Sequence, residues 1–248
     1  MPFFTANRSL DQGSGSGWLT WYSWNPNRFG TQAANWHGDV VVAHARAELG
    51  KAGVLAAFWH GLDFANAAGN SLATAGLHWS GSADLGGGWR LPWVASLATQ
   101  RDHGDNPADY SAPYRLLELG LGHGPATLHL GVETLGGDAT RANARFLTPL
   151  ATLHAFQGWA DKFLVTPPQG IEDRYVSVDA LWHGTSGTIA WHDYRADAVE
   201  RRYGHEWNVS VAHKFGKRYE LLGKWADYSS DGFATDTRKA WLMVTATF

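Results

Sequence analysis

The sequence contains no cysteine, which excludes disulfide bonds and thiolate metal sites. It also contains no run of about eighteen apolar residues, although 44 % of the chain is hydrophobic, and this excludes a transmembrane helix. The mean hydropathy is only −0.28. A formal net charge of −3 is too balanced to predict a nucleic-acid partner. The chain also lacks a helix-spaced apolar pattern of a length comparable to the pattern described next.

That pattern is regular alternation, and the closing stretch RKAWLMVTATF shows it most clearly. Counting back from Phe248, every second residue is apolar (Ala246, Val244, Leu242 and Ala240), whereas the intervening residues are mixed, polar and charged. Because side chains of a strand alternate between two faces, the pattern predicts a strand of about ten residues. Two environments suit such a strand: a soluble sandwich, or a barrel in lipid.

Similar segments recur along almost the whole chain. Most are close to the roughly 9–11 residues that a tilted strand needs to cross a bilayer. A content of 29 Gly, 14 Trp and 8 Tyr supplies the turn residues and amphipathic aromatics that such a fold uses. We expect about twelve strands, at 17–25, 39–49, 53–64, 71–83, 89–102, 114–123, 125–136, 174–184, 188–198, 204–215, 219–228 and 238–248.

The links between these strands decide between the two environments. Short links such as GKAG and GHGP alternate without a break with long ones such as RDHGDNPADYSAP. An up-and-down barrel has tight turns at one end and long loops at the other, whereas a Greek-key sandwich gives no reason for such parity. The links therefore predict an all-β, transmembrane antiparallel up-and-down β-barrel over 17–248, with residues 1–16 as an N-terminal extension or linker. An even strand count places both termini on the periplasmic side.

In such a barrel the apolar faces meet lipid and the polar faces line the lumen. Aromatic residues near strand ends, among them Trp89, Trp182, Tyr203 and Phe248, are expected at the headgroup levels. Strand facing is clearest for twelve polar residues, which we predict to line the pore: His44, Arg46, Glu48, Glu118, His129, Glu133, Asp179, Glu206, Lys214, Glu220, Lys224 and Lys239. Because they carry charges of both signs, the sequence yields no firm ion selectivity.

One long segment, 145–173, breaks the alternation and carries three of the nine prolines and a run of aromatics. A loop of this length in a compact domain is usually functional, and its apolar content argues against disorder. We expect an extracellular loop over 137–173 to fold toward the lumen and narrow it, with Glu133 opposing Lys162. The predicted constriction residues are His154, Trp159, Asp161 and Lys162.

Within this segment, TPLATLHAFQGWADKFLVTPPQGIEDRY closely resembles a stretch of the alginate-export-type outer-membrane porins. AWHDYRADAVERRYGHEWNVSVAHKF and YELLGKWADYSS resemble the C-terminal strands of the same family, so the resemblance covers roughly residues 53–248. It implies an outer-membrane barrel that conducts small or polymeric solutes. Family barrels are larger, which indicates a shortened or engineered barrel here. The mixed charges on the lumen-facing positions do not predict alginate as the substrate.

Other chemistry was weighed against these residues. His78 and Ser80 share one face, at a spacing used by membrane-embedded phospholipases, but that face is the predicted lumen and no orienting residue is identifiable. The 12 histidines lack zinc-site spacing. The acidic stretches DNPAD and SSDGFATD lack the ligand spacing of a calcium loop. We therefore predict that the protein is not an enzyme and has no metal site and no cofactor.

The function that we predict is passive diffusion of small hydrophilic solutes or ions across the bacterial outer membrane, by a monomer whose partners are the lipid bilayer and the solutes. The alternative is a non-conducting structural or engineered scaffold with a loop-occluded lumen. GSGSG at 13–17 favours that alternative if it is an engineered join, although a natural turn explains it equally well. A soluble carbohydrate-binding sandwich is a third interpretation. The opening MPFFTANRSL does not resemble a signal peptide, so we expect none in this chain.

Overall fold

A computed structural model of the chain describes residues 15–24, 36–141, 143–150 and 156–247, with 15–24 described as backbone alone. Over these ranges the fold consists of twelve strands and two short 3-10 helices, η2 (Gly50–Ala52) and η3 (Ala68–Asn70). No helix in these ranges is both long enough and apolar enough to cross a membrane. The strands are β1 (Gly15–Trp24), β2 (Gly38–Glu48), β3 (Val54–Phe64), β4 (Leu72–Gly86), β5 (Trp89–Asp102), β6 (Ser111–His123), β7 (Ala126–Leu135), β8 (Ile171–Trp182), β9 (Thr185–Arg195), β10 (Arg202–Phe215), β11 (Tyr219–Ser230) and β12 (Thr237–Ala246).

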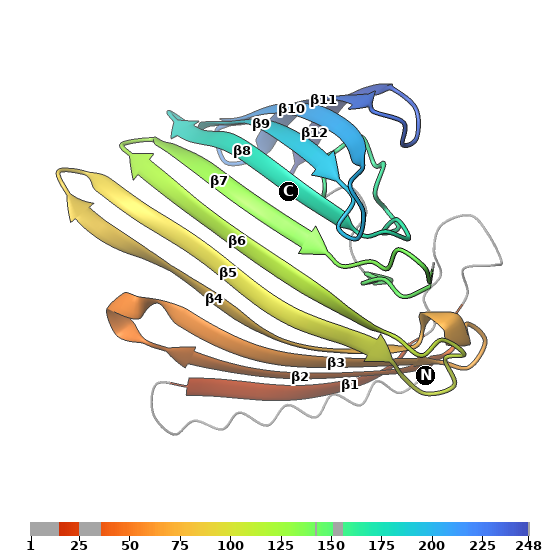
Figure 1. Cartoon of the computed structure of the whole chain (residues 1–248). Helices are drawn as coiled ribbons and strands as arrows, with labels where there is room; N and C mark the ends of the chain where they lie inside the picture. Colours follow the sequence, from red (N-terminus) through yellow and green to blue (C-terminus); the bar gives the residue numbers. More distant parts are fainter. Residues whose placement is uncertain (1–14, 25–35, 142, 151–155, 248) are drawn as a thin grey trace.

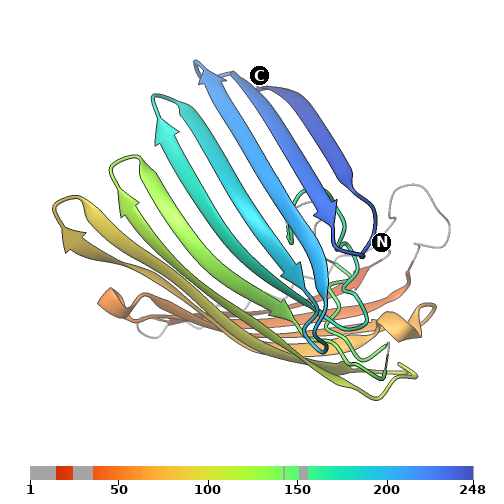
Figure 2. The same ribbon diagram turned by 45° about the horizontal axis from the view of Figure 1, so that its top comes forward.

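Every strand pairs antiparallel with its neighbours in the sequence, which gives one sheet in the order β1 to β12 (Figure 1). This confirms the predicted all-β, up-and-down architecture and its strand number. The sheet curves into a deep trough (Figure 2). Within the described residues β12 does not pair with β1, so the sheet is curved but open rather than a closed barrel. The orientation of the termini relative to a membrane stays a prediction.

The alternation of short and long links is confirmed as well. Short links gather at one end of the sheet, on the left of Figure 1, and longer ones at the other. Between β4 and β5 the chain reverses on Gly86, Gly87 and Gly88, whose φ angles of 79°, 62° and 81° are left-handed and cost little for glycine. The short links are 49–53, 87–88, 124–125, 183–184 and 216–218; the longer ones include 65–71, 103–110, 136–170, 196–201 and 231–236.

Several predicted strand boundaries were wrong by about three residues: β4 ends at Gly86, β6 begins at Ser111 and β9 spans Thr185–Arg195. Two further shifts change the predicted division of the chain. β1 begins at Gly15, which pairs with Ala47, so two residues of the expected extension belong to the sheet; residues 1–14 lie outside the described part. β8 begins at Ile171, so the long segment is 136–170 rather than 137–173. The reason is that Ile171 and Asp173 continue the ladder opposite Leu135 and Glu133 of β7.

The sheet has two chemically different faces. On β6, the alternate residues Leu117, Leu119 and Leu121 are all exposed on one face, which we call the convex face. Neighbouring strands continue it: the exposed fraction is 57 % for Leu130 of β7 and 76 % for Leu242 of β12. A broad apolar surface of this kind marks contact with lipid or with another protein.

The expected aromatic positions divide between exposed and buried. Trp89 and Trp182 lie near strand ends and are exposed, in keeping with an interfacial place. Tyr203 was wrongly placed at a headgroup level: its exposed fraction is 0 %, because the long segment covers it and brings Phe163 to 5.9 Å between ring centres. Phe248 lies outside the described residues.

The buried core lies on the opposite, concave face, where segment 136–170 packs against the strands (Figure 2). Its largest members include Phe146 and Phe163 of the segment and Tyr194 and Tyr228 of the sheet. A smaller cluster is formed by side chains of β2, β3 and β4 at the same end: Val40, Leu62, Phe64 and Leu72. A sandwich would bury one sheet against another; here a single sheet buries a folded segment instead.

Candidate functional site: the narrowed interior of the trough

All twelve predicted pore-lining residues lie on the concave face. Glu133, Glu206 and Lys239 contact segment 136–170 directly. The other nine share that face because they lie an even number of residues from these contacts on the same strand, or in register with them across the ladder. Strand alternation therefore placed these side chains correctly, although what they do stays a prediction.

The segment is fastened first at Glu206 of β10, whose exposed fraction is 0 %. The backbone N–H groups of Trp159 and Ala160 donate to its Oε1 at 2.6 and 2.8 Å, and Trp159 also donates to Asn208 Oδ1 at 3.1 Å. Successive backbone donors of this kind form a concavity that binds an anion. Gly158, with φ at +79°, makes the approach possible, because a Cβ there would meet Tyr194 Oη at 2.2 Å.

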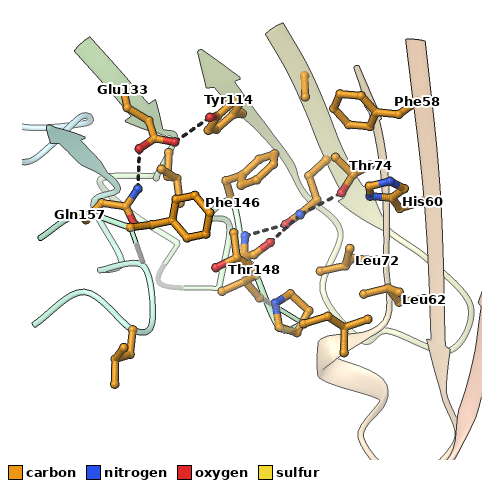
Figure 3. Close-up of a pocket in the computed structure, with 18 of the residues that line it drawn as sticks. Phe58, His60, Leu62, Leu72, Thr74, Tyr114, Glu133, Phe146, Thr148 and Gln157 are labelled. Carbon is orange, nitrogen blue, oxygen red and sulfur yellow. Dashed lines mark hydrogen bonds between the residues drawn. The ribbon is translucent and has the colours of Figure 1, made fainter. Parts of the chain in front are cut away.

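A second fastening point is Glu133 of β7, shown in Figure 3. Its carboxylate accepts from Tyr114 Oη at 2.6 Å and from Gln157 Nε2 at 2.7 Å. The prediction that Glu133 opposes Lys162 was therefore wrong. Lys162 points to the other side of the trough, where its Nζ lies 5.7 Å from the centre of the Tyr228 ring.

The segment also contacts the last two strands. Asp161 accepts from Lys239 Nζ of β12 at 2.6 Å, and Lys224 Nζ of β11 lies 4.0 Å from the centre of the Trp159 ring. Trp159, Asp161 and Lys162 thus all lie in the trough, as expected of constriction residues. His154 lies outside the described residues.

The segment is also held by aromatic packing on one wall and by hydrogen bonds between a side chain and the segment backbone on the other. Phe163 stacks on Phe233, with ring centres 5.2 Å apart and planes 7° from parallel, and lies 4.6 Å from Tyr194. On the other wall, Gln100 of β5 accepts from the N–H of Leu147 at 2.7 Å and donates to its carbonyl at 2.8 Å. A buried amide that pairs both ways with one backbone residue fixes the position of that residue firmly.

The pKa values of two groups in the long links, Asp138 and Tyr110, are shifted by their surroundings. Asp138 accepts from the backbone N–H and hydroxyl of Thr140 and from the backbone and guanidinium of Arg141, and these bonds lower its pKa. Tyr110 donates to Gln100 at 3.1 Å, and burial, with a smaller contribution from the charge of Asp102, raises the pKa of Tyr110 to about 12.

Between the segment and β2 to β7 lies a cavity of about 520 Å³ (Figure 3). This is the size of a small-molecule site, and its wall is mostly apolar. Its few polar side chains are His60, Thr74, Gln100, Tyr114, Glu133, Thr148 and Gln157. Of these only Glu133 was predicted. On β3 the concave-face residues Phe58, His60 and Leu62 are as apolar as the residues of the convex face. Strand alternation therefore did not indicate which face His60 occupies.

A chain of polar contacts continues along β6 to β9. His129 lies 3.1 Å from Glu118 and 3.6 Å from Asp179. His192 lies 3.0 Å from Asp173. The sequence pattern missed this second pair because β8 was expected to start one residue after Asp173.

His78, which the sequence places on one face with Ser80, bonds to a different serine in the structure. His78 Nδ1 lies 2.6 Å from the hydroxyl of Ser96 on the neighbouring strand, and both residues are on the concave face. In the described part of the chain, no carboxylate bonds to His78, so an oriented nucleophile–base pair is not assembled there. The same part of the chain holds no cluster of three His, Asp or Glu residues suited to a metal ion.

Comparison with known proteins finds matches at the level of fold. No protein-family model matches the chain, and neither does any curated protein sequence. Among solved structures, the outer membrane protein OpdK of Pseudomonas aeruginosa superposes with a TM-score of 0.71 at 14 % identity, over 97 % of this chain and 69 % of that one. OccK10 (OpdN) of the same organism gives 0.70 at 13 % identity, over 96 % and 70 %. OprD gives 0.64 at 11 % identity, over 94 % and 64 %.

OpdK and OprD are outer-membrane proteins, and OpdK has also been crystallised with vanillate. At this identity the likeness shows a porin-type sheet and no more. It does not support the alginate-export family that the sequence stretches suggested.

Proposed function

We propose that this chain forms the wall of an outer-membrane channel through which small hydrophilic solutes diffuse passively. One observation carries the proposal: a single up-and-down sheet with an apolar convex face and a charged concave face. That is the arrangement of a barrel with lipid outside and water inside. The fold-level match to outer-membrane proteins supports it. Eleven of the twelve concave-face residues line the path, whereas Glu206, whose exposed fraction is 0 %, anchors the segment beneath it. The channel works as a monomer, and it has no catalytic role.

The proposal makes one structural demand. In the hydrocarbon layer an unpaired strand edge is too costly to persist, because no water replaces its missing hydrogen bonds. The outer edges of β1 and β12 must therefore be hydrogen-bonded once the sheet is in a membrane.

The cavity and the segment together define the narrow part of the path. The segment is tied to Glu206 and Lys239 on one side of the trough, whereas the cavity of about 520 Å³ lies against the opposite wall. Solutes therefore pass on the β2 to β7 side. A cavity of this size can hold a small molecule. The structurally similar OpdK was crystallised with such a molecule, vanillate.

The same fastening also favours a second candidate, a scaffold whose interior is closed by the segment and conducts nothing. The specific observation is that Glu133, Glu206 and Lys239, on three different strands, all hold it.

The test is single-channel recording after refolding into a planar lipid bilayer, with the wild type beside a Glu206→Ala variant that releases the segment. Discrete steps from the wild type support the channel. If the wild type is silent although folded and inserted, and the variant conducts, the scaffold is correct. Silence from both inserted proteins refutes a channel function.

A further inference from the structure

Three histidines line one wall of the trough, one on each of three adjacent strands. They are His44 of β2, His60 of β3 and His78 of β4, all on the concave face. The cavity wall includes His60, so the line begins at the narrow part of the path (Figure 3). The other two lie farther from the cavity along their strands.

The strand register arranges them as steps. His60 is level with Val42 and Thr74, His44 is level with Phe58, and His78 is level with Ala56, two residues farther along β3. Each step is therefore two residues, about 7 Å, along the strand direction. Arg46 of β2 is level with Ala56 as well, so a permanent cation lies at the height of His78 with β3 between them.

The opposite wall carries carboxylates that already have partners. Glu206 accepts two backbone N–H groups, Asp173 is paired with His192, and Glu118 is paired with His129. Each of these three carboxylates is therefore engaged by a neighbour of its own. The histidine wall is different, because an imidazole gains a positive charge as the pH falls.

The fixed charges on the concave face around the three histidines, within the described residues, come from β2 to β7. β2 contributes Arg46 and Glu48, which pair with each other at 3.2 Å. β4 contributes Asp84, and β5 contributes Arg90 and Asp102 beside uncharged Ser96 and Gln100. β6 and β7 contribute Glu118 and Glu133 across the trough. The segment residues on the cavity wall carry no charged side chain. Protonation of the line therefore adds positive charge to an interior in which carboxylates outnumber fixed cations.

We propose that His44, His60 and His78 determine which ions the channel prefers. With the imidazoles neutral, the carboxylates around the path, which outnumber its fixed cations, favour cations; with the imidazoles charged, the preference shifts toward small inorganic and organic anions. Rings of fixed charge select ions in this way in other pores. The inference rests on the proposed channel function.

The experiment measures the reversal potential in a planar bilayer under a potassium chloride gradient, at about pH 7.5 and about pH 5, on either side of the usual imidazole pKa. The wild type is expected to become more anion-selective at the lower pH, by about threefold or more in the anion-to-cation permeability ratio. The triple variant His44→Gln, His60→Gln, His78→Gln is expected to lose most of that change. The matched control replaces three histidines at turns or on the convex face: His123→Gln, His183→Gln and His205→Gln.

Each outcome has a clear meaning. Discrete conductance with a reversal potential that does not respond to pH refutes this inference and leaves the channel function standing. A full pH response in the triple variant also refutes it, because the carboxylates would then be responsible. Loss of the response in the control variant as well refutes the assignment to this line. Absence of conductance in all proteins refutes the channel function itself. If the triple variant does not insert, the single variants His60→Gln and His78→Gln decide, each being expected to remove part of the shift.

Discussion

Gly158 is the position where one added methyl group should release the long segment. A Cβ at this residue would lie 2.2 Å from Tyr194 Oη and 2.6 Å from Glu206 Oε2, well inside van der Waals contact. Both neighbours are buried strand residues that cannot swing away. In Gly158→Ala the segment must therefore move, and the backbone donors of Trp159 and Ala160 leave Glu206.

The size of the effect follows from what is lost. A hydrogen bond to a charged group contributes about 1.5–3 kcal/mol, so two of them contribute about 3–6 kcal/mol to docking of the segment. The left-handed φ of +79° adds about 1–2 kcal/mol of strain for alanine. Gly86→Ala is a matched control, because Gly86 has the same φ of +79° with nothing within 4 Å of its Cβ position. The variant and control differ only in the steric clash.

The assay is the rate of tryptic cleavage after Lys162 of the folded protein in detergent, read by mass spectrometry. Cleavage of a locally opened segment follows the population of the open form. A loss of about 3 kcal/mol raises that population about a hundredfold, since about 1.4 kcal/mol is a factor of ten. Equal cleavage rates in Gly158→Ala and Gly86→Ala would refute the idea that the Glu206 contact holds the segment.

Three further predictions address the turn at Asp138, the ion pair at β12 and the convex face. Because hydrogen bonding lowers the pKa of Asp138, its stabilising charge is present above the ordinary carboxyl pKa of about 4 and is lost as the pH falls through the lowered value. Asp138→Asn should therefore reduce the amide protection factors of Thr140 and Arg141 at neutral pH, whereas the wild type should lose protection only in acid; unchanged protection in the variant would contradict this. For the Asp161–Lys239 pair, a double-mutant cycle of Asp161→Asn and Lys239→Gln on segment cleavage should give a coupling of about 1 kcal/mol, because both side chains are partly exposed. A coupling near zero would show that the pair does not hold the segment. Leu130→Arg on the convex face should lower refolding yield into lipid, at a cost of about 2–4 kcal/mol, while Ser177→Arg on the concave face should not. Equal yields would argue against lipid on the convex face.

The strands could be predicted because each one has a local signature. Alternation places one apolar and one mixed face on each strand, and the parity of the links fixes the order of the sheet. The predictions failed where a distant contact decides the outcome. Tyr203 has the sequence context of an exposed strand end, yet Phe163, far along the chain, covers it.

The interior was harder to predict for the same reason. Alternation indicates which face Glu133 occupies, but its partner depends on how the segment turns, and Gln157 with φ at 50° brings its amide to the carboxylate in place of Lys162. His60 lies among apolar neighbours on both sides of its strand. Only the fold reveals that it lines a cavity.

The neighbour-to-neighbour pairing of the strands has a consequence for assembly. Apart from the β7–β8 pair, which is joined by segment 136–170, the neighbouring strands from β2 to β12 need only short loop closures, so each part of the sheet can grow strand by strand. The long segment cannot dock at so early a stage, because Asp161 meets Lys239, 78 positions farther along the chain, only after the strands between them have found their place. The polypeptide therefore completes its wall first and fills its interior last, and an incompletely assembled molecule would hold an emptier and wider trough than the finished one.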